Sequence, residues 1–122
     1  MHNFIMPADM AAKLNELRDI IYGYNLQKGW HDKPREFGTD CALIHSEVSE
    51  ALEGDRKQIM DDHLPNRPMP EVEFGDAIIR LMDTSGKMKF DIGGAVVEKF
   101  EYNKLRKDHT KEVRALQGGK QY

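Results

Sequence analysis

Apolar residues recur at three- and four-residue steps along most of the chain, which is the spacing of amphipathic α-helices. The first such segment carries Leu14, Leu17 and Ile21 on one face. No segment alternates apolar and polar residues in the manner of a strand. The pattern therefore predicts an all-α bundle of four to five helices. The four clearest helical segments are residues 8–28, 40–56, 71–88 and 92–108.

Proline and glycine mark the breaks between these helices. Residues 29–38 contain Pro34 and two glycines around the only tryptophan, Trp30, and predict a loop. A second break over residues 63–70 contains three prolines, and the last of them, Pro70, suits the first turn of a helix. Both loops are long enough to contribute residues to a site.

Two polar residues fit the N-cap positions of helices that follow a break. Thr39 precedes the second helical segment, and Asp91 precedes the fourth. The last stretch, residues 109–122, ends in a Gly118-Gly119-Lys120 sequence and a short polar remainder. We expect this stretch to form a mobile, mildly basic tail.

The composition restricts the class of protein. With 122 residues, 39% of them hydrophobic and 32% charged, the chain fits a single domain over 1–122 with a small core, so association between copies is expected. The 18 basic and 21 acidic residues give a net charge of -3, which opposes duplex nucleic acid as the main partner. The single cysteine, Cys41, cannot form an internal disulfide, and no apolar run is long enough to cross a membrane. The start of the sequence lacks the pattern of a secretion signal, so we expect a cytoplasmic protein.

Two carboxylates lie close together in the second predicted helix, and a solvent-exposed face does not account well for one of them. Glu47 and Glu50 are three residues apart and share one side of the helix. Glu47 falls inside the apolar arc that runs from Leu43 to Leu52, and Glu50 lies at its edge. Because a carboxylate on a packing face is costly unless it is paired or binds a metal ion, Glu47 needs a partner.

The third predicted helix is apolar over more than half of its circumference and has one narrow polar strip. The strip consists of Glu73, Asp76, Arg80, Asp83 and Thr84. An intrahelical ion pair between Asp76 and Arg80 would explain it as a solvent-exposed rim. Alternatively, the strip lines a polar cleft, and the pattern leaves both interpretations open.

Four carboxylates converge if the Glu47/Glu50 edge faces Glu73 and Asp76 across two antiparallel helices. Their mutual repulsion then requires a divalent cation. All four are hard oxygen ligands, a set that selects Mg²⁺ or Mn²⁺ over Zn²⁺. Because Mg²⁺ takes further oxygens from phosphate groups, a phosphate ester is the expected class of substrate.

The fourth predicted helix supplies groups that suit a phosphate. Lys99, Asn103 and Arg106 share one helical face, but they could equally cover an edge of the bundle with their aliphatic stems. Trp30, in the first loop, offers a flat surface on which a nucleobase could stack. A single loop tryptophan also commonly closes one end of a core, so its role stays open.

Taken in order, these residues resemble the MazG-like all-α nucleoside triphosphate pyrophosphohydrolases. The resemblance covers residues 24–106 and rests on Glu47-x-x-Glu50, a gap of 22 residues, Glu73-x-x-Asp76, and then Lys99-x-x-x-Asn103-x-x-Arg106. The Gly118-Gly119-Lys120 sequence is similar to the basic tail of that family. A longer segment than in the family separates it from Arg106.

The resemblance implies hydrolysis of a nucleoside triphosphate to the monophosphate and pyrophosphate, with Mg²⁺ held by the four acids and one glutamate accepting the proton of the attacking water. Lys99 and Arg106 would bind phosphate oxygens, Asn103 would bind phosphate or sugar, and Trp30 would contact the base. The resemblance also implies a homodimer or a dimer of dimers, which a broadly apolar third helix would suit.

Two other functions remain open from the sequence. A dimeric-type dUTPase or a phosphoribosyl-ATP pyrophosphohydrolase would share the acidic pairs and differ in the base pocket. A non-catalytic helical interaction protein would use the acidic cleft or the third helix to hold a protein partner, without divalent-dependent turnover. If the chain is a pyrophosphohydrolase, both the removal of modified nucleotides and the control of the normal nucleotide pool fit it.

Overall fold

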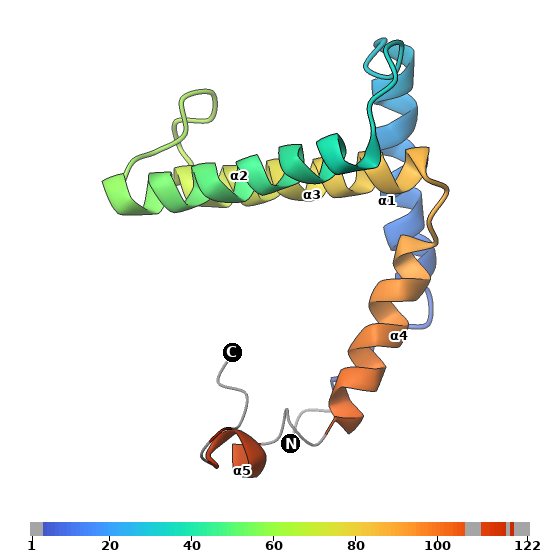
Figure 1. Cartoon of the computed structure of the whole chain (residues 1–122), viewed down its shortest axis with the longest axis vertical. Helices are drawn as coiled ribbons and strands as arrows, with labels where there is room; N and C mark the ends of the chain where they lie inside the picture. The colour runs from blue at the N-terminus through green and yellow to red at the C-terminus, as the bar shows by residue number, and fades with distance from the viewer. Residues whose placement is uncertain (1–3, 107–110, 117, 119–122) are drawn as a thin grey trace. The chain divides into compact units, whose positions relative to one another are not determined.

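The protein is all-helical in a computed structural model that describes residues 4–106, 111–116 and 118. Its helices are α1 (Met10–Gln27), α2 (Phe37–Lys57), α3 (Met69–Lys87), α4 (Ile92–Leu105) and the single turn α5 (Lys111–Arg114) (Figure 1). The described residues contain no strand, only an isolated bridge between Met60 and Pro68. The expected all-α class is therefore confirmed. None of the helices in this described part has the length and apolar character needed to span a membrane.

The starts of two helices follow the local signals in the sequence. Pro70 lies in the first turn of α3, where its missing N–H has no helical partner to lose. The Asp91 side chain caps α4 by accepting a hydrogen bond from the Gly94 amide at 2.9 Å. The first turn of each helix is therefore stabilised by residues next to it in the chain.

The predicted N-cap at Thr39 is wrong. Helix α2 begins at Phe37 and has Glu36 as its N-cap, which makes no capping hydrogen bond through its side chain. The Asp40 amide donates to the Glu36 carbonyl at 3.1 Å, so the helix continues past Thr39 toward the N-terminus. The carboxylate of Asp40, in turn, accepts from side chains outside the helix, which fixes this first turn without a local cap.

The chain divides into two compact units, which we describe separately. The first comprises Met1–Asn15 and Asp91–Tyr122. In it, Asn15 donates to the Asp91 carboxylate and accepts from the Gly93 amide, both at 2.8 Å, and so joins the start of α4 to α1. A side chain at Gly93 would collide with the backbone of Ala11, so glycine permits this close approach.

The sequence predicts that the fourth helix ends near residue 108, but α4 ends earlier, at Leu105. The Arg106 amide turns back to the Asn103 carbonyl at 3.3 Å, and Arg106 itself has an extended backbone (φ -76°, ψ 125°). An i→i+3 bond of this kind commonly tightens the last turn of a helix. Lys99 and Asn103 therefore lie on the helix, whereas Arg106 lies beyond its end.

The second unit, Glu16–Phe90, contains α2 and α3 lying side by side as an antiparallel pair (Figure 1). Small residues line their contact: Ala51 and Ala77 are buried, and a side chain at Gly54 would meet Met69. The two backbones can therefore approach closely. The connection between them is held by Asp61, whose carboxylate accepts from two successive backbone amides, those of His63 and Leu64.

Helix α3 buries three of the five residues of its polar strip and exposes much of its apolar surface. Glu73, Asp83 and Thr84 are all less than 10% exposed, whereas Phe74 is 58% and Ile78 is 49% exposed. The interpretation of the strip as a solvent-exposed rim is therefore wrong for these three residues. The exposed apolar side chains form the kind of surface that is commonly covered by another element or another molecule.

Candidate metal centre

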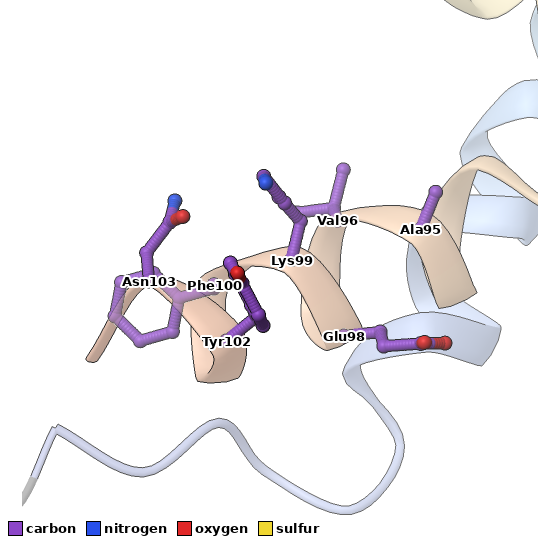
Figure 2. A pocket seen from close by; sticks show the side chains of 7 residues that line it. All are labelled: Ala95, Val96, Glu98, Lys99, Phe100, Tyr102 and Asn103. Atoms are coloured by element: carbon purple, nitrogen blue, oxygen red, sulfur yellow. The ribbon is translucent and has the colours of Figure 1, made fainter. Parts of the chain in front are cut away.

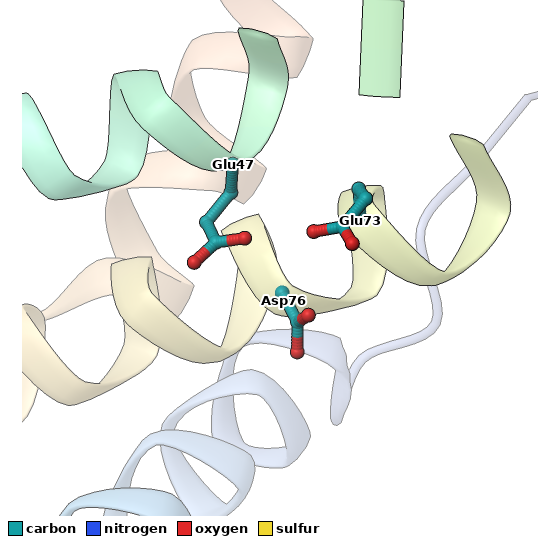
Figure 3. A group of neighbouring side chains, drawn as sticks. All are labelled: Glu47, Glu73 and Asp76. Carbon is teal, nitrogen blue, oxygen red and sulfur yellow. The ribbon is translucent and has the colours of Figure 1, made fainter. Parts of the chain in front are cut away.

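Three carboxylates converge between α2 and α3. Glu47 approaches from α2, and Glu73 and Asp76 approach from α3 (Figure 3). One carboxylate oxygen from each residue lies within 4.8 Å of the other two. Oxygens on opposite sides of a bound Mg²⁺ are about 4.2 Å apart, so small side-chain rotations would bring all three oxygens into ligand range. The group could therefore hold a metal ion.

The group is partly shielded from water, and one of its oxygens lacks a partner. Glu73 is 7% exposed, and its Oε2 is buried without a hydrogen-bond partner. The Glu47 side chain is 12% exposed, and Asp76 is half-buried. A buried carboxylate oxygen without a donor lowers the stability of the fold, and a cation or a proton at this position would relieve that effect.

Burial and the closeness of the carboxylates raise the pKa values of two of the three acids. Burial raises the pKa of Glu73 to about 8, helped by the Glu47 and Glu50 carboxyl groups, to which a protonated Glu73 could donate, and by the charges of Glu50 and Asp76. The pKa of Asp76 is also raised, first by burial and then by the charges of Glu47 and Asp61, while the Arg80 charge acts in the opposite direction. Without a cation, the site therefore holds a proton at neutral pH.

Glu50 lies next to this group but does not belong to the three that converge. It is exposed, and it is near enough to Glu73 for its charge and hydrogen bonding to raise the pKa of that residue. The structure therefore brings together Glu47, Glu73 and Asp76 of the four expected acids and leaves Glu50 exposed beside them.

Arg80 pairs with an acid on the opposite helix rather than making the intrahelical ion pair that the sequence suggests. Its Nε donates to Glu47 Oε1 at 2.8 Å, across 33 residues of sequence. Asp76, four residues before Arg80, experiences its charge without a hydrogen bond of this kind. The polar strip of α3 therefore contributes to the contact with α2.

A cavity of about 280 Å³ adjoins the acids within the same unit. It is lined by Asn25, Trp30, Arg35, Glu47, Asp76, Ile79, Arg80 and Asp83. Trp30 is 55% exposed, so in this structure it borders the cavity instead of closing the end of a core. The cavity thus combines carboxylates, two guanidinium groups and one exposed aromatic ring.

A buried ion network fixes the loop that carries Trp30. Asp40 is 2% exposed and accepts hydrogen bonds from Arg35 Nε, at 2.8 Å, and from Lys87 Nζ. Burial acts to raise the pKa of Asp40, but the hydrogen bonds and charges of Lys87 and Arg35 outweigh it and lower that pKa. Arg35 also donates to the Trp30 carbonyl at 3.2 Å, so the network holds the backbone of the tryptophan.

A second pair supports the same loop. His31 Nε2 lies 2.8 Å from Asp83 Oδ1, both side chains are 9% exposed, and Tyr22 meets the histidine ring edge-on with the ring centroids 5.0 Å apart. No pattern in the sequence indicates that His31 and Arg35 hold the loop that carries Trp30. Asp83 was recognisable as part of the strip, but its partner lies 52 residues away.

The candidate phosphate-binding residues belong to the first unit. Lys99 and Asn103 line a hollow of about 910 Å³ along α4 (Figure 2). Lys99 Nζ lies 4.7 Å from the centroid of the Tyr102 ring, and Asn103 Oδ1 is buried without a hydrogen-bond partner. The contact of Lys99, Asn103 and Arg106 with the acids stays a prediction. Lys120 lies outside the described residues.

We found no protein-family model that matches the chain, no curated protein with significant similarity to it, and no solved structure that significantly resembles it. The resemblance to the MazG-like enzymes therefore rests on the order and spacing of the residues named above.

Proposed function

We propose that the chain is a Mg²⁺-dependent nucleoside triphosphate pyrophosphohydrolase of the MazG-like type, which converts nucleoside or deoxynucleoside triphosphates to the monophosphate and pyrophosphate. The observation that carries the proposal is the buried, unpartnered Oε2 of Glu73 among carboxylates that converge from two helices. The order of the acids along the chain supports the same assignment.

The donor set favours Mg²⁺, with Mn²⁺ as a substitute. Glu47, Glu73 and Asp76 supply only carboxylate oxygens, and neither histidine nor cysteine belongs to this group. Glu50, beside them and open to solvent, is a further ligand or the acceptor of a proton. Bound there, the cation would neutralise triphosphate charge and make a water molecule more acidic.

Residues around the acids suit the rest of a nucleotide. Trp30 presents an exposed ring at the cavity for stacking on a base, and the Arg35–Asp40 network holds its backbone in place. We assign the binding of phosphate oxygens to Lys99 and Arg106, and a phosphate or sugar contact to Asn103, by resemblance to the family. Control or cleaning of a cytoplasmic nucleotide pool is the corresponding cellular role.

We further propose that the chain acts as a homodimer or a dimer of dimers. Phe74 and Ile78 on α3, together with Leu52 on α2, are 49–62% exposed in the single chain. Large apolar side chains that are this exposed and lie on one pair of helices favour association.

The same exposed apolar side chains also favour a second candidate, a non-catalytic helical interaction protein. Such a protein would need no cation at the acids, whereas a preformed site gains stability when a cation binds. A rise in melting temperature with millimolar Mg²⁺ or Mn²⁺ that is absent in Glu73→Gln would therefore favour the enzyme. A dUTPase or a phosphoribosyl-ATP pyrophosphohydrolase would share that rise and differ in the substrate that competes best.

Product analysis tests the proposal. Purified protein would be incubated with canonical and modified nucleoside triphosphates and with phosphoribosyl-ATP, in Mg²⁺ and in EDTA. Chromatography would resolve monophosphate, diphosphate, pyrophosphate and orthophosphate. We expect monophosphate and pyrophosphate in equal amounts, in Mg²⁺ only. Diphosphate and orthophosphate as products, or no turnover of any substrate, would reject it.

A further inference from the structure

We propose that Arg80 acts as an internal counter-ion for Glu47 in the metal-free protein, releases that carboxylate when a divalent cation binds, and then receives a phosphate group in the adjoining cavity. This inference rests on the proposed metal site. On this proposal, binding of the divalent cation frees Arg80 to bind the phosphate group, so Arg80 couples the two binding events.

Arg80 and a cation at the acids would use the same carboxylate. Arg80 Nε is bonded to Glu47 Oε1 at 2.8 Å, and Glu47 is one of the three acids that converge. The two side chains are 31% and 12% exposed, so the pair is partly removed from water. A dication at the acids would be repelled by a guanidinium that remained on Glu47.

Arg80 compensates only part of the acidic group. Its bond serves Glu47, while Glu73 Oε2 stays buried and has no partner. A cation placed among the three oxygens would contact both Glu47 and Glu73, whereas of these two the Arg80 guanidinium bonds only to Glu47. Arg80 therefore compensates fewer of these carboxylate oxygens than a cation at the same place would.

The cavity beside the acids offers a place where the released guanidinium would bind a phosphate. Two arginines line the 280 Å³ cavity, and Arg35 is already held by Asp40 and by the Trp30 carbonyl. Arg80 makes its described hydrogen bond to Glu47 through Nε, so its remaining donors are open to a ligand. A guanidinium binds phosphate oxygens in a planar, often bidentate arrangement, which suits this position beside the acids.

A purely orienting role for Arg80 makes the opposite prediction. A residue that holds a metal ligand in position typically strengthens metal binding, and its removal weakens affinity by about 10–100-fold. A competing counter-ion weakens metal binding, and its removal strengthens affinity. The sign of the change in Mn²⁺ affinity therefore distinguishes the two roles.

The test is isothermal titration calorimetry of Mn²⁺ into the metal-free wild-type chain, Arg80→Gln and Arg56→Gln. Arg56 is the matched control, since it pairs with Glu53 on the exposed side of α2, away from the site. A second titration adds inorganic pyrophosphate to each protein in saturating Mg²⁺. Circular dichroism at the titration temperature confirms that each variant is folded.

We expect Arg80→Gln to bind Mn²⁺ about tenfold more tightly than wild type and pyrophosphate about tenfold more weakly. Arg56→Gln should match wild type in both titrations. Unchanged or weaker Mn²⁺ binding by Arg80→Gln would overturn the inference and leave the proposed function standing. Unchanged pyrophosphate affinity would overturn the assignment of Arg80 to phosphate. Absence of Mn²⁺ binding by the wild-type chain would overturn both the inference and the metal site.

Discussion

Arg80 Nε on α3 lies 2.8 Å from Glu47 Oε1 on α2, and this bond joins the two helices at the point where the carboxylates converge. It compensates one acid of the group, while Glu73 keeps a buried oxygen without a partner. Packing of α2 on α3 therefore buries neighbouring carboxylates at a cost in stability, and the surrounding residues offset only part of that cost. A residue arrangement that lowers stability in this way is typical of functional sites.

Replacing Glu73 with glutamine should stabilise the metal-free protein. At neutral pH the substitution removes a buried group that must either take up a proton or carry a charge that Glu50 and Asp76 repel, and it keeps the shape of the side chain. We expect the melting temperature in EDTA to rise by about 3–6 °C, which corresponds to about 1 kcal/mol for a domain of this size. Glu71→Gln, an exposed position on the same helix, is the control and should change it little. A lower melting temperature for Glu73→Gln would show that the carboxylate contributes to the fold.

The stability of the metal-free protein should fall as the pH rises from about 5 to 8. The pKa of Glu73 is raised from 4.5 to about 8, so the unfolded chain releases this proton first and is favoured increasingly as the pH rises through that range. Asp76, whose pKa is also raised, acts in the same direction.

Denaturant unfolding in EDTA at pH 5.5, 7 and 8 measures this effect, and saturating Mg²⁺ should reduce it because the cation replaces the proton. Glu73→Gln should show a flatter pH dependence than wild type. The same slope in both proteins would contradict the assignment of the effect to Glu73.

Removing the charge of Asp40 should destabilise the fold. Asp40→Asn would leave Arg35 and Lys87 side by side without their shared buried carboxylate, at an expected cost of about 2–4 kcal/mol. Because the pKa of Asp40 is lowered, its contribution is present above pH 3.8 and is lost as the pH falls through the folded-state value. Urea unfolding should therefore show a large difference in the free energy of unfolding between wild type and Asp40→Asn at pH 7 and a smaller difference at pH 3. Equal stability at pH 7 would contradict this account of the network.

Trp30 should report nucleotide binding directly. It is the only tryptophan in the chain, and it is 55% exposed at the edge of the cavity, so the intrinsic tryptophan fluorescence comes from this one position. Stacking of a base should quench its emission or shift it to shorter wavelength, whereas pyrophosphate alone should produce a much smaller change. Titration of a non-hydrolysable nucleoside triphosphate analogue in Mg²⁺ measures both. Equal responses to the analogue and to pyrophosphate would contradict base stacking on Trp30.

Helical periodicity predicted the elements well because it depends on residues three and four apart, which remain neighbours in any helix. The helix ends were less predictable. Asp91 caps α4 through a local bond, but α2 begins before Thr39, where Asp40 is held by Arg35 and Lys87. Lys87 is 47 residues from Asp40, so no local pattern includes it.

Glu47, Glu73 and Asp76 could also be predicted to lie together, since the apolar pattern defines the helical face on which each lies, whereas Glu50, expected with them, is exposed. The partners of these acids could not be predicted. Arg80 has an acid four residues before it, yet its hydrogen bond goes to Glu47, because the packing of α3 on α2 brings that carboxylate within reach. His31 and Asp83 likewise meet only in the folded chain. Spacing along the sequence identifies a face, whereas tertiary packing selects the contact.

The central claim is that the convergent acids hold the cation for pyrophosphohydrolysis, and one comparison tests it most directly. Phosphorus NMR would follow a nucleoside triphosphate in Mg²⁺ with the wild-type chain, Glu73→Gln and Glu71→Gln. We expect wild type and Glu71→Gln to produce monophosphate and pyrophosphate, and Glu73→Gln to lose at least about 100-fold in rate while remaining at least as stable as wild type. Turnover by Glu73→Gln at the wild-type rate, or no turnover by the wild-type chain, would contradict the account.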